Sequence, residues 1–360
     1  MAEPHLPSLT IEGFRGFKKL DLRKLGHVNL LVGKNGVGKS SVLDAVRLYS
    51  SHASFETLGA LLFERGDPRG PYDPDAFSTL LPLSNTLEPL PLAPPIRVGP
   101  IAEPISISVR WTTTTVEPDG TTRVRFHEGV VSPSVDRGIA IVVESPTERI
   151  RYAPLVRRNG PWSGEYIDLP QRRPNPTYRF VSSHGLDYAA VGKYWDSITL
   201  TEWEDEMHRV LSLFDSRVLK FSLQGEGGSR RVMARLKDLV RPVPLSFLGE
   251  GATRFFGIAL AMTNCQNGFL LIDEFENGLH YTAQEKLWRF IVRAAKELNV
   301  QVFATTHSND CLEAFSKAAN EATDVEGVVS RLVEVDGVLH VAQYDERLID
   351  FVTREMVEIR

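Results

Sequence analysis

The sequence has few cysteines and no long apolar run, so it lacks the features of disulfide-rich secreted proteins, cysteine-based zinc proteins and membrane-spanning proteins. It has two cysteines, Cys265 and Cys311, which are too few for a disulfide framework or a cysteine-rich zinc site. The first residues lack a basic segment followed by an apolar stretch. No apolar run approaches the roughly twenty residues that a membrane-spanning helix needs. We therefore expect a cytoplasmic protein that contacts no membrane and keeps both cysteines reduced in its core.

The chain also lacks a positive charge excess, an internal repeat and a heptad pattern. Its 46 acidic residues outnumber 41 basic ones, which gives a formal net charge of −5. Any contact with DNA must therefore be local, because no overall positive field attracts a nucleic acid. The missing heptads exclude a long coiled-coil arm. With 360 residues and 42% hydrophobic content, the chain can still bury a large core.

One phosphate-binding motif is complete. Gly33–Ser40 has the pattern G-x-x-x-x-G-K-S, after the apolar strand-like run Val28–Val32 and before a stretch with helical spacing. Glycines let backbone N–H groups surround phosphate oxygens, Lys39 can reach the β- and γ-phosphates, and Ser40 can ligate Mg²⁺. The sequence therefore predicts ATP and Mg²⁺ as cofactors. The expected ATP contacts are Asn35, Gly36, Gly38, Lys39, Ser40 and Ser41.

A second group of acidic residues follows another apolar run. Gly268–Ile272 ends in Asp273 and Glu274, as expected of a Walker B strand. Neighbouring parallel strands share one crevice at their carboxyl ends, so Asp273 can approach the Mg²⁺ on Ser40. Glu274 is then the candidate general base, because a carboxylate can align a water and accept its proton.

Two further segments have weaker signals. Val300–Ala304 leads into His307, which either contacts the γ-phosphate or the attacking water, or is incidental beside Ser308, a good helix cap. The turn with Gly249, Glu250 and Gly251 precedes an apolar helix, whose N-terminus favours an anion. Many structural turns look similar, but this one lies just before the Walker B segment.

The order of segments predicts an α/β fold with inserted material. We expect an N-terminal ATPase lobe over 1–64, an inserted region over 65–244 and a C-terminal ATPase lobe over 245–360. Prolines between Gly66 and Pro104 argue against long helices and central strands there. The following segments predict an antiparallel meander, a helical segment, a hairpin, a strand pair and a last short helix: 105–152, 188–214, 218–236, 329–341 and 346–357.

The ordered motifs resemble those of a P-loop ABC-type ATPase head. F-R-G-F at Phe14–Phe17, I-D-E-F-E-N-G-L-H at Ile272–His280 and T-T-H-S at Thr305–Ser308 are similar to the OLD-like branch of the AAA ATPases. That branch is related to the SMC and RecF heads of bacterial defence and repair systems. The resemblance implies a mixed or parallel central sheet, an antiparallel β subdomain and a small helical insertion.

The resemblance also implies a mechanism. Glu274 would be catalytic, Asp273 would support the metal, and His307 would be the switch histidine. Gly249–Gly251 of one subunit would close over ATP bound to another, in a homodimer or higher even oligomer. Such a head would hydrolyse ATP and regulate a separate effector, a nuclease or toxin, in antiphage defence. The alternative is a RecF-like DNA-binding clamp or loader in repair.

Three features depart from the related proteins. Gly249 stands where many ABC heads have a serine, and no coiled-coil arm interrupts the head. The segment after His307 is too short for the TOPRIM nuclease domain of OLD nucleases, so we expect none.

Four other features each leave two interpretations open. Arg15 either contacts the nucleotide or forms a structural ion pair, and His280 either serves a subunit contact or begins a helix. The basic strip that includes Arg230 and Arg231 either contacts phosphates or forms a solvated strand face. The acidic run at Thr201–Glu206 suggests a capped helix start rather than a metal cluster.

Overall fold

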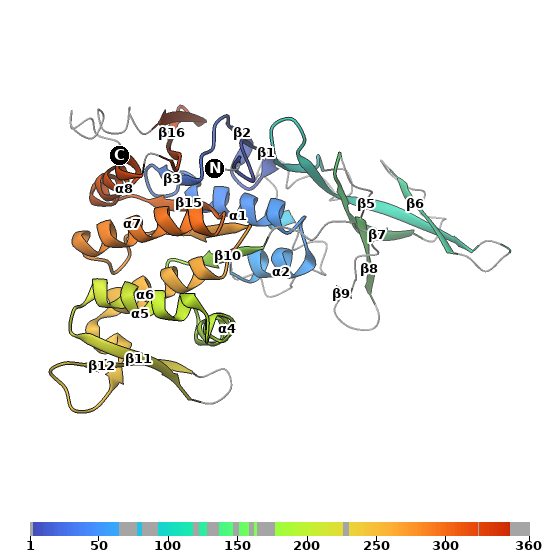
Figure 1. Ribbon diagram of the computed structural model, residues 1–360. Helices are drawn as coiled ribbons and strands as arrows, with labels where there is room; N and C mark the ends of the chain where they lie inside the picture. Colours follow the sequence, from blue (N-terminus) through green and yellow to red (C-terminus); the bar gives the residue numbers. More distant parts are fainter. Residues whose placement is uncertain are drawn as a thin grey trace. The chain divides into compact units, whose positions relative to one another are not determined.

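The structure is a computed structural model with two compact units, each described by itself (Figure 1). The first unit comprises Met1–Pro7, Lys24–Leu43 and Pro176–Arg360, and the second comprises Ser8–Arg23 and Asp44–Asn175. The predicted segments are distributed differently. Residues 8–23 and 44–64 of the expected N-terminal lobe group with the second unit, and residues 176–244 of the expected insertion group with the first. The residues that the structure describes are 3–64, 78–80, 93–116, 118, 122–127, 137–146, 151–157, 162–163, 177–225, 230–322 and 324–345.

A mixed sheet forms the centre of the first unit. Its first five strands are parallel to their neighbours, and only the last is antiparallel. Three central strands are buried along their whole length, which explains why their sequences are mostly apolar: Val28–Val32, Phe269–Ile272 and Gln301–Thr306. In spatial order the strands are β10 (Tyr178–Val181), β14 (Phe269–Ile272), β15 (Gln301–Thr306), β3 (Val28–Val32), β16 (Gly327–Val335) and β17 (Val338–Asp345).

Helices with well-defined caps pack with this sheet. Ser308 caps α8 by accepting a hydrogen bond from the Cys311 amide, and Thr201 caps α5 in the same way from Trp203. Phe275 stacks on Trp288 of α7 with ring centroids 4.1 Å apart. The first unit contains the first turn of α1 (Lys39–Ser50). Its other helices are α4 (Tyr188–Ile198), α5 (Glu202–Phe214), α6 (Glu250–Thr263), α7 (Tyr281–Glu297) and α8 (Asn309–Glu321).

A small antiparallel sheet in the first unit contains the predicted hairpin. Strands β11 (Val218–Gln224) and β12 (Arg231–Leu236) pair with each other, and β13 (Val243–Pro244) pairs with β12. The 3₁₀ helix η5 (Leu245–Leu248) then leads directly into α6. The predicted hairpin is confirmed, and the helical segment predicted over 188–214 consists of two helices, α4 and α5.

The second unit is built on an antiparallel sheet. Strand β5 pairs with β7 through Ser106–Thr113 and with β6 through Trp111–Val116, so the simple meander expected here is wrong in its pairing. These overlapping registers place β6 and β7 on opposite edges of β5. The strands are β2 (Phe17–Leu22), β1 (Leu9–Phe14), β4 (Ile96–Gly99), β5 (Ile105–Val116), β6 (Thr122–His127), β7 (Arg137–Glu144), β8 (Arg151–Arg157) and β9 (Trp162–Ser163). Two short helices, α2 (Phe55–Phe63) and η1 (Ser78–Leu80), complete it.

The proline-rich segment contains an inner strand, contrary to expectation. Strand β4 lies between β1 and β5 and pairs with both. Prolines at 94, 95 and 100 flank the strand without entering it, so its four residues keep their N–H groups for the sheet.

Buried charges in the second unit pair with one another. Arg15 forms an ion pair with Asp44, and both side chains are buried. Arg47 donates to Asp44 at 3.1 Å and to Glu64 at 2.7 and 2.8 Å. Of the two interpretations of Arg15, the structure therefore shows the structural ion pair.

Two other features complete the comparison with the sequence. The helix expected over 346–357 lies outside the described residues. Among the described helices, none combines the length and the apolar character needed to cross a membrane.

Candidate nucleotide-binding site

The sheet of the first unit gathers the predicted motifs along one edge. β15 lies between β3, which leads into the phosphate loop, and β14, which leads into Asp273 and Glu274. β10 adds the loop at Ser182 on the other side of β14. Because these four strands are parallel, the loops at their carboxyl ends meet at one edge. The sequence prediction of a shared crevice follows from this topology.

The phosphate loop holds its lysine by backbone carbonyls. Lys39 Nζ donates to the carbonyl oxygens of Gly33 at 2.8 Å and Lys34 at 3.0 Å. Burial lowers the pKa of Lys39, and the carboxylates of Glu276, Asp273 and Glu274 partly oppose that effect. The ammonium group can exchange these carbonyls for phosphate oxygens without leaving the loop.

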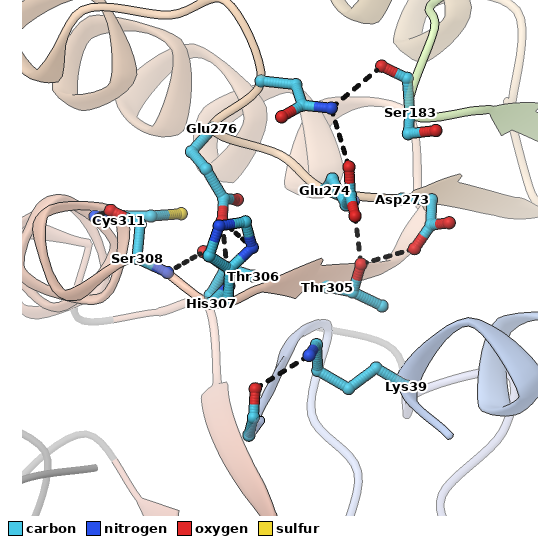
Figure 2. A network of polar contacts seen from close by, with 12 residues as sticks. Lys39, Ser183, Asp273, Glu274, Glu276, Thr305, Thr306, His307, Ser308 and Cys311 are labelled. Atoms are coloured by element: carbon cyan, nitrogen blue, oxygen red, sulfur yellow. Dashed lines mark hydrogen bonds and ion pairs between the residues drawn. The ribbon is translucent and has the colours of Figure 1, made fainter. Parts of the chain in front are cut away.

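Three hydroxyl and carboxylate groups form a compact set beside the loop. Ser40 Oγ donates to Asp273 Oδ1 at 2.9 Å, and Thr305 Oγ1 donates to the same oxygen at 2.6 Å. Thr305 Oγ1 also accepts the amide of Glu274 at 2.8 Å (Figure 2). Thr305 was not predicted, although its place at the end of an apolar strand is a usable signal.

The donor set of Ser40 and Asp273 fits Mg²⁺. Magnesium prefers oxygen ligands and is usually held by one or two carboxylates together with substrate phosphates. In the described part of the chain no three His, Cys, Asp or Glu side chains cluster as a metal site would require. A magnesium ion at Ser40 and Asp273 would therefore take its remaining ligands from nucleotide and water.

Glu274 is held in an unusual backbone conformation. Its φ is +49°, a value that few residues other than glycine adopt. Glu274 Oε2 accepts a hydrogen bond from Asn277 Nδ2 at 2.7 Å, and the same nitrogen lies 3.2 Å from the Ser183 carbonyl oxygen (Figure 2). The backbone conformation of Glu274 and the side-chain amide of Asn277 together orient the carboxylate, as a positioned base would require.

A buried arginine holds the turn at Asp273 and Glu274 by hydrogen bonds to its carbonyl oxygens. Arg254, on α6, donates to the carbonyl oxygens of Asp273 at 2.5 Å and Glu274 at 2.8 Å, and to that of Ser182. Burial lowers the pKa of Arg254 to about 10, so it remains charged at neutral pH. Neither Arg254 nor Asn277 was predicted from the sequence. A lone arginine inside an otherwise apolar helix was the available signal for the first.

His307, the predicted switch histidine, lies against a glutamate. Glu276 Oε1 accepts the backbone amide of His307 at 2.8 Å and lies 3.0 Å from His307 Nδ1. The His307 side chain is 46% exposed and lines a cavity of about 390 Å³ with Gly33, Lys34 and Asn35. Ser308 caps α8, as one interpretation of this segment expected. His307 also lines the cavity beside the phosphate loop, as the other interpretation expected.

The glycine-rich turn packs on the loop after Walker B. Gly249 has a φ of +95°, a backbone conformation that favours glycine. A Cβ at Gly251 would lie 2.4 Å from the Gly278 carbonyl oxygen, so this contact also requires glycine. Helix α6 begins at Glu250, which is exposed. The contact of this turn with a second subunit stays a prediction.

Two of the weaker candidates also have defined partners. Arg230 pairs with Asp196 at 2.5 Å, while Arg231 is exposed and lies 5.9 Å from the Tyr188 ring centroid. His280 precedes the first turn of α7 and contacts the Thr282 hydroxyl at 3.0 Å, so it begins that helix.

Two family models match the chain. Residues 5–69, which contain the phosphate loop, match a model described as AAA ATPase domain. Residues 202–312, which contain the Walker B acids and His307, match one described as AAA domain, putative AbiEii toxin, Type IV TA system. Together these matches support an ATP-binding ATPase.

Individual relatives match over shorter stretches. An ATP/GTP phosphatase of Helicobacter pylori is 30% identical over 121 residues, which cover 33% of this chain and 32% of the relative. The DNA replication and repair protein RecF of Clostridioides difficile is 48% identical over 52 residues, 14% of each chain. The uncharacterized protein MJECL11 of Methanocaldococcus jannaschii is 35% identical over 86 residues, 24% of this chain and 72% of the relative. The chain thus spans at most a third of the first two relatives.

Solved structures share the fold across nearly the whole chain. An Smc head bound to the C-terminal winged-helix domain of ScpA has a TM-score of 0.53 at 14% identity, and the match covers 95% of this chain and 98% of that one. An Smc head with an extended coiled coil, from Pyrococcus furiosus, has a TM-score of 0.53 at 12% identity, covering 98% and 99%. These matches confirm the P-loop ABC-type head fold. Both matched stretches have AAA ATPase sequence, and the chain belongs to the same family as MJECL11.

Proposed function

We propose that this protein is a Mg²⁺-dependent ATPase that assembles on ATP. The observation that carries the proposal is the contact between Ser40 and Asp273, 2.9 Å apart, beside Lys39 and Glu274 on one sheet edge. Phosphoryl transfer needs positioning and charge stabilisation more than covalent chemistry, and these four groups supply both.

Each residue of the site has a role that its surroundings support. Lys39 would bind the β- and γ-phosphates, and Ser40 and Asp273 would hold the metal, which neutralises developing phosphate charge. Glu274 would accept the proton of the attacking water while Asn277 keeps the carboxylate in place. Arg254 would keep the turn at Glu274 fixed through its two carbonyl contacts.

The turn at Gly249–Gly251 supports assembly of subunits, because its first two residues are exposed. Helix α6 begins in this turn at Glu250, and the N-terminus of a helix favours an anion. We propose that this turn closes over ATP on a second subunit, giving a homodimer or a higher even oligomer with composite sites. ATP turnover would then control a separate effector, a nuclease or toxin, in antiphage defence. The toxin–antitoxin description of the model matching 202–312 motivates that setting.

Mixing two inactive variants tests the composite site. Lys39→Ala removes the phosphate contact, and Glu250→Trp adds bulk on the exposed turn without touching the core. If each site combines two subunits, each variant alone is inactive and an equal mixture recovers about a quarter of the wild-type ATPase rate. A mixture as inactive as its parts would show that one subunit contains the whole site.

A RecF-like DNA-binding function is the second candidate. β12 and the following turn expose Arg231, Arg235, Lys237 and Arg241, which favours contact with a phosphate backbone. If DNA binds here, replacing these four residues with glutamine should weaken duplex affinity and flatten its salt dependence. Unchanged affinity and salt slope would exclude this surface.

A further inference from the structure

One carboxylate oxygen contacts the switch histidine twice. Glu276 Oε1 accepts the backbone amide of His307 at 2.8 Å and lies 3.0 Å from the ring Nδ1 (Figure 2). The glutamate side chain is only 10% exposed. Its other oxygen, Oε2, is buried without a hydrogen-bond partner among the described residues. A buried carboxylate with one unsatisfied oxygen is costly, so its position calls for a role beyond closing the loop.

We propose that Glu276 is a positioning residue that keeps the neutral His307 ring protonated at Nδ1 and leaves Nε2 free to accept a hydrogen bond from the attacking water. An ionised carboxylate can only accept hydrogen bonds, so the nitrogen facing it carries the proton. This inference rests on the proposed ATPase, because it assigns a task at the same site.

The surroundings of the ring favour this arrangement. His307 is fixed on the Glu276 side by two contacts, while its exposed part lines the cavity with Gly33 and Asn35 of the phosphate loop. The carboxylate also acts on the loop itself, since it raises the pKa of Lys39 against the effect of burial. Glu276 therefore contacts His307 directly and acts on Lys39 through its charge.

The ring's protonation can be measured without ATP turnover. We expect ¹⁵N-histidine NMR spectra of the whole chain to show His307 as the Nδ1–H tautomer, with its signal assigned by its loss in His307→Ala. In Glu276→Ala the ring should shift toward the Nε2–H form. An Nε2–H ring in the wild-type protein, or an unchanged ring in Glu276→Ala, would overturn the proposal.

Kinetics then separate positioning from a merely structural role. Glu276→Ala should lower kcat roughly 10-fold with little change in KM, which is less than the roughly 10²–10⁴-fold of a group that itself transfers the proton, because Glu276 acts through His307. Glu276→Gln, whose amide oxygen can still accept both hydrogen bonds, should recover part of the loss. The losses in Glu276→Ala and His307→Ala should not add in the double variant, because the glutamate acts through the histidine.

Control experiments separate the role of Glu276 from the proposed ATPase activity. Glu313→Ala removes an exposed glutamate of α8 that pairs with Lys317 at 2.8 Å, and it should behave as wild type. Fully additive losses in the double variant would contradict the role of Glu276. A wild-type chain without ATPase activity would instead contradict the proposed function, while the NMR result would still decide the tautomer.

Discussion

The two units use buried and half-buried acids in opposite ways. In the second unit, Asp44 is enclosed by two arginines, Arg15 and Arg47, and all three side chains are at most 9% exposed. In the first unit, Asp273 and Glu274 have neutral hydrogen-bond partners and lie at the open edge of a sheet. A carboxylate enclosed by cations stabilises a fold, whereas one with neutral partners keeps its charge for a ligand. This contrast predicts that variants of one unit lose activity and variants of the other lose stability.

The largest effect is expected at the proposed base. Glu274→Gln should lower ATP turnover roughly 10³-fold, because an amide cannot accept the proton of the attacking water. ATP affinity should persist, since the phosphate loop is untouched, and the ATP-bound dimer should accumulate. Phosphate release and light scattering with ATP measure the two results. Normal turnover in this variant would contradict the assigned base.

The next effect concerns binding. Lys39→Ala should weaken ATP affinity on the order of 300-fold, since the ammonium makes charge-assisted contacts to phosphate oxygens. The unfolding temperature without nucleotide should hardly change. Titration with a fluorescent ATP analogue measures the affinity, and Lys193→Ala, which alters an exposed lysine on α4, is the matched control. Equal affinities in the two variants would remove Lys39 from the site.

The matching experiment in the second unit should show the reverse. Asp44→Ala leaves Arg15 and Arg47 without this buried carboxylate and should lower the free energy of unfolding by about 3 kcal/mol. Below the unfolding transition, ATP affinity should stay within about twofold of wild type. Chemical denaturation and ATP titration together check the pair of results. A large loss of affinity in the folded variant would break the contrast between the units.

The smallest effect is expected at the glycine-rich turn. Gly249→Ala should cost about 1 kcal/mol, because a side chain disfavours its φ of +95°. A Cβ at this position would meet no atom within 4 Å, so backbone strain is the only cost within one chain. Denaturation curves give the cost. A loss above about 3 kcal/mol would indicate a packing role that the described chain does not show.

The sequence predicted most reliably what depends on local pattern. β3, β14 and β15 are mostly apolar and lead into polar residues, and parallel strands bring such ends together. It could not predict the contacts that hold those residues. Arg254 and Glu276 contact residues 19 to 72 positions away, through hydrogen bonds that form only in the folded chain.

Two errors in the second unit have physical causes as well. The many prolines between Gly66 and Pro104 argued against a central strand, but β4 needs only four residues without proline, and the segment contains such a stretch. The pairing of β6 was assigned by chain order, whereas β5 is 12 residues long and has room for different partners on each edge. Strand length, which sequence patterns bound poorly, decided both outcomes.

Helix α1 crosses from one unit to the other. Its first turn contains Lys39 and Ser40 in the first unit, and its later turns contain Asp44 and Arg47 in the second. Cutting the chain between residues 43 and 44 would leave four amides and four carbonyls of a helix without their partners. Expression of the two units as separate proteins should therefore fail at this boundary, and any dissection of the molecule has to keep the whole helix on one fragment.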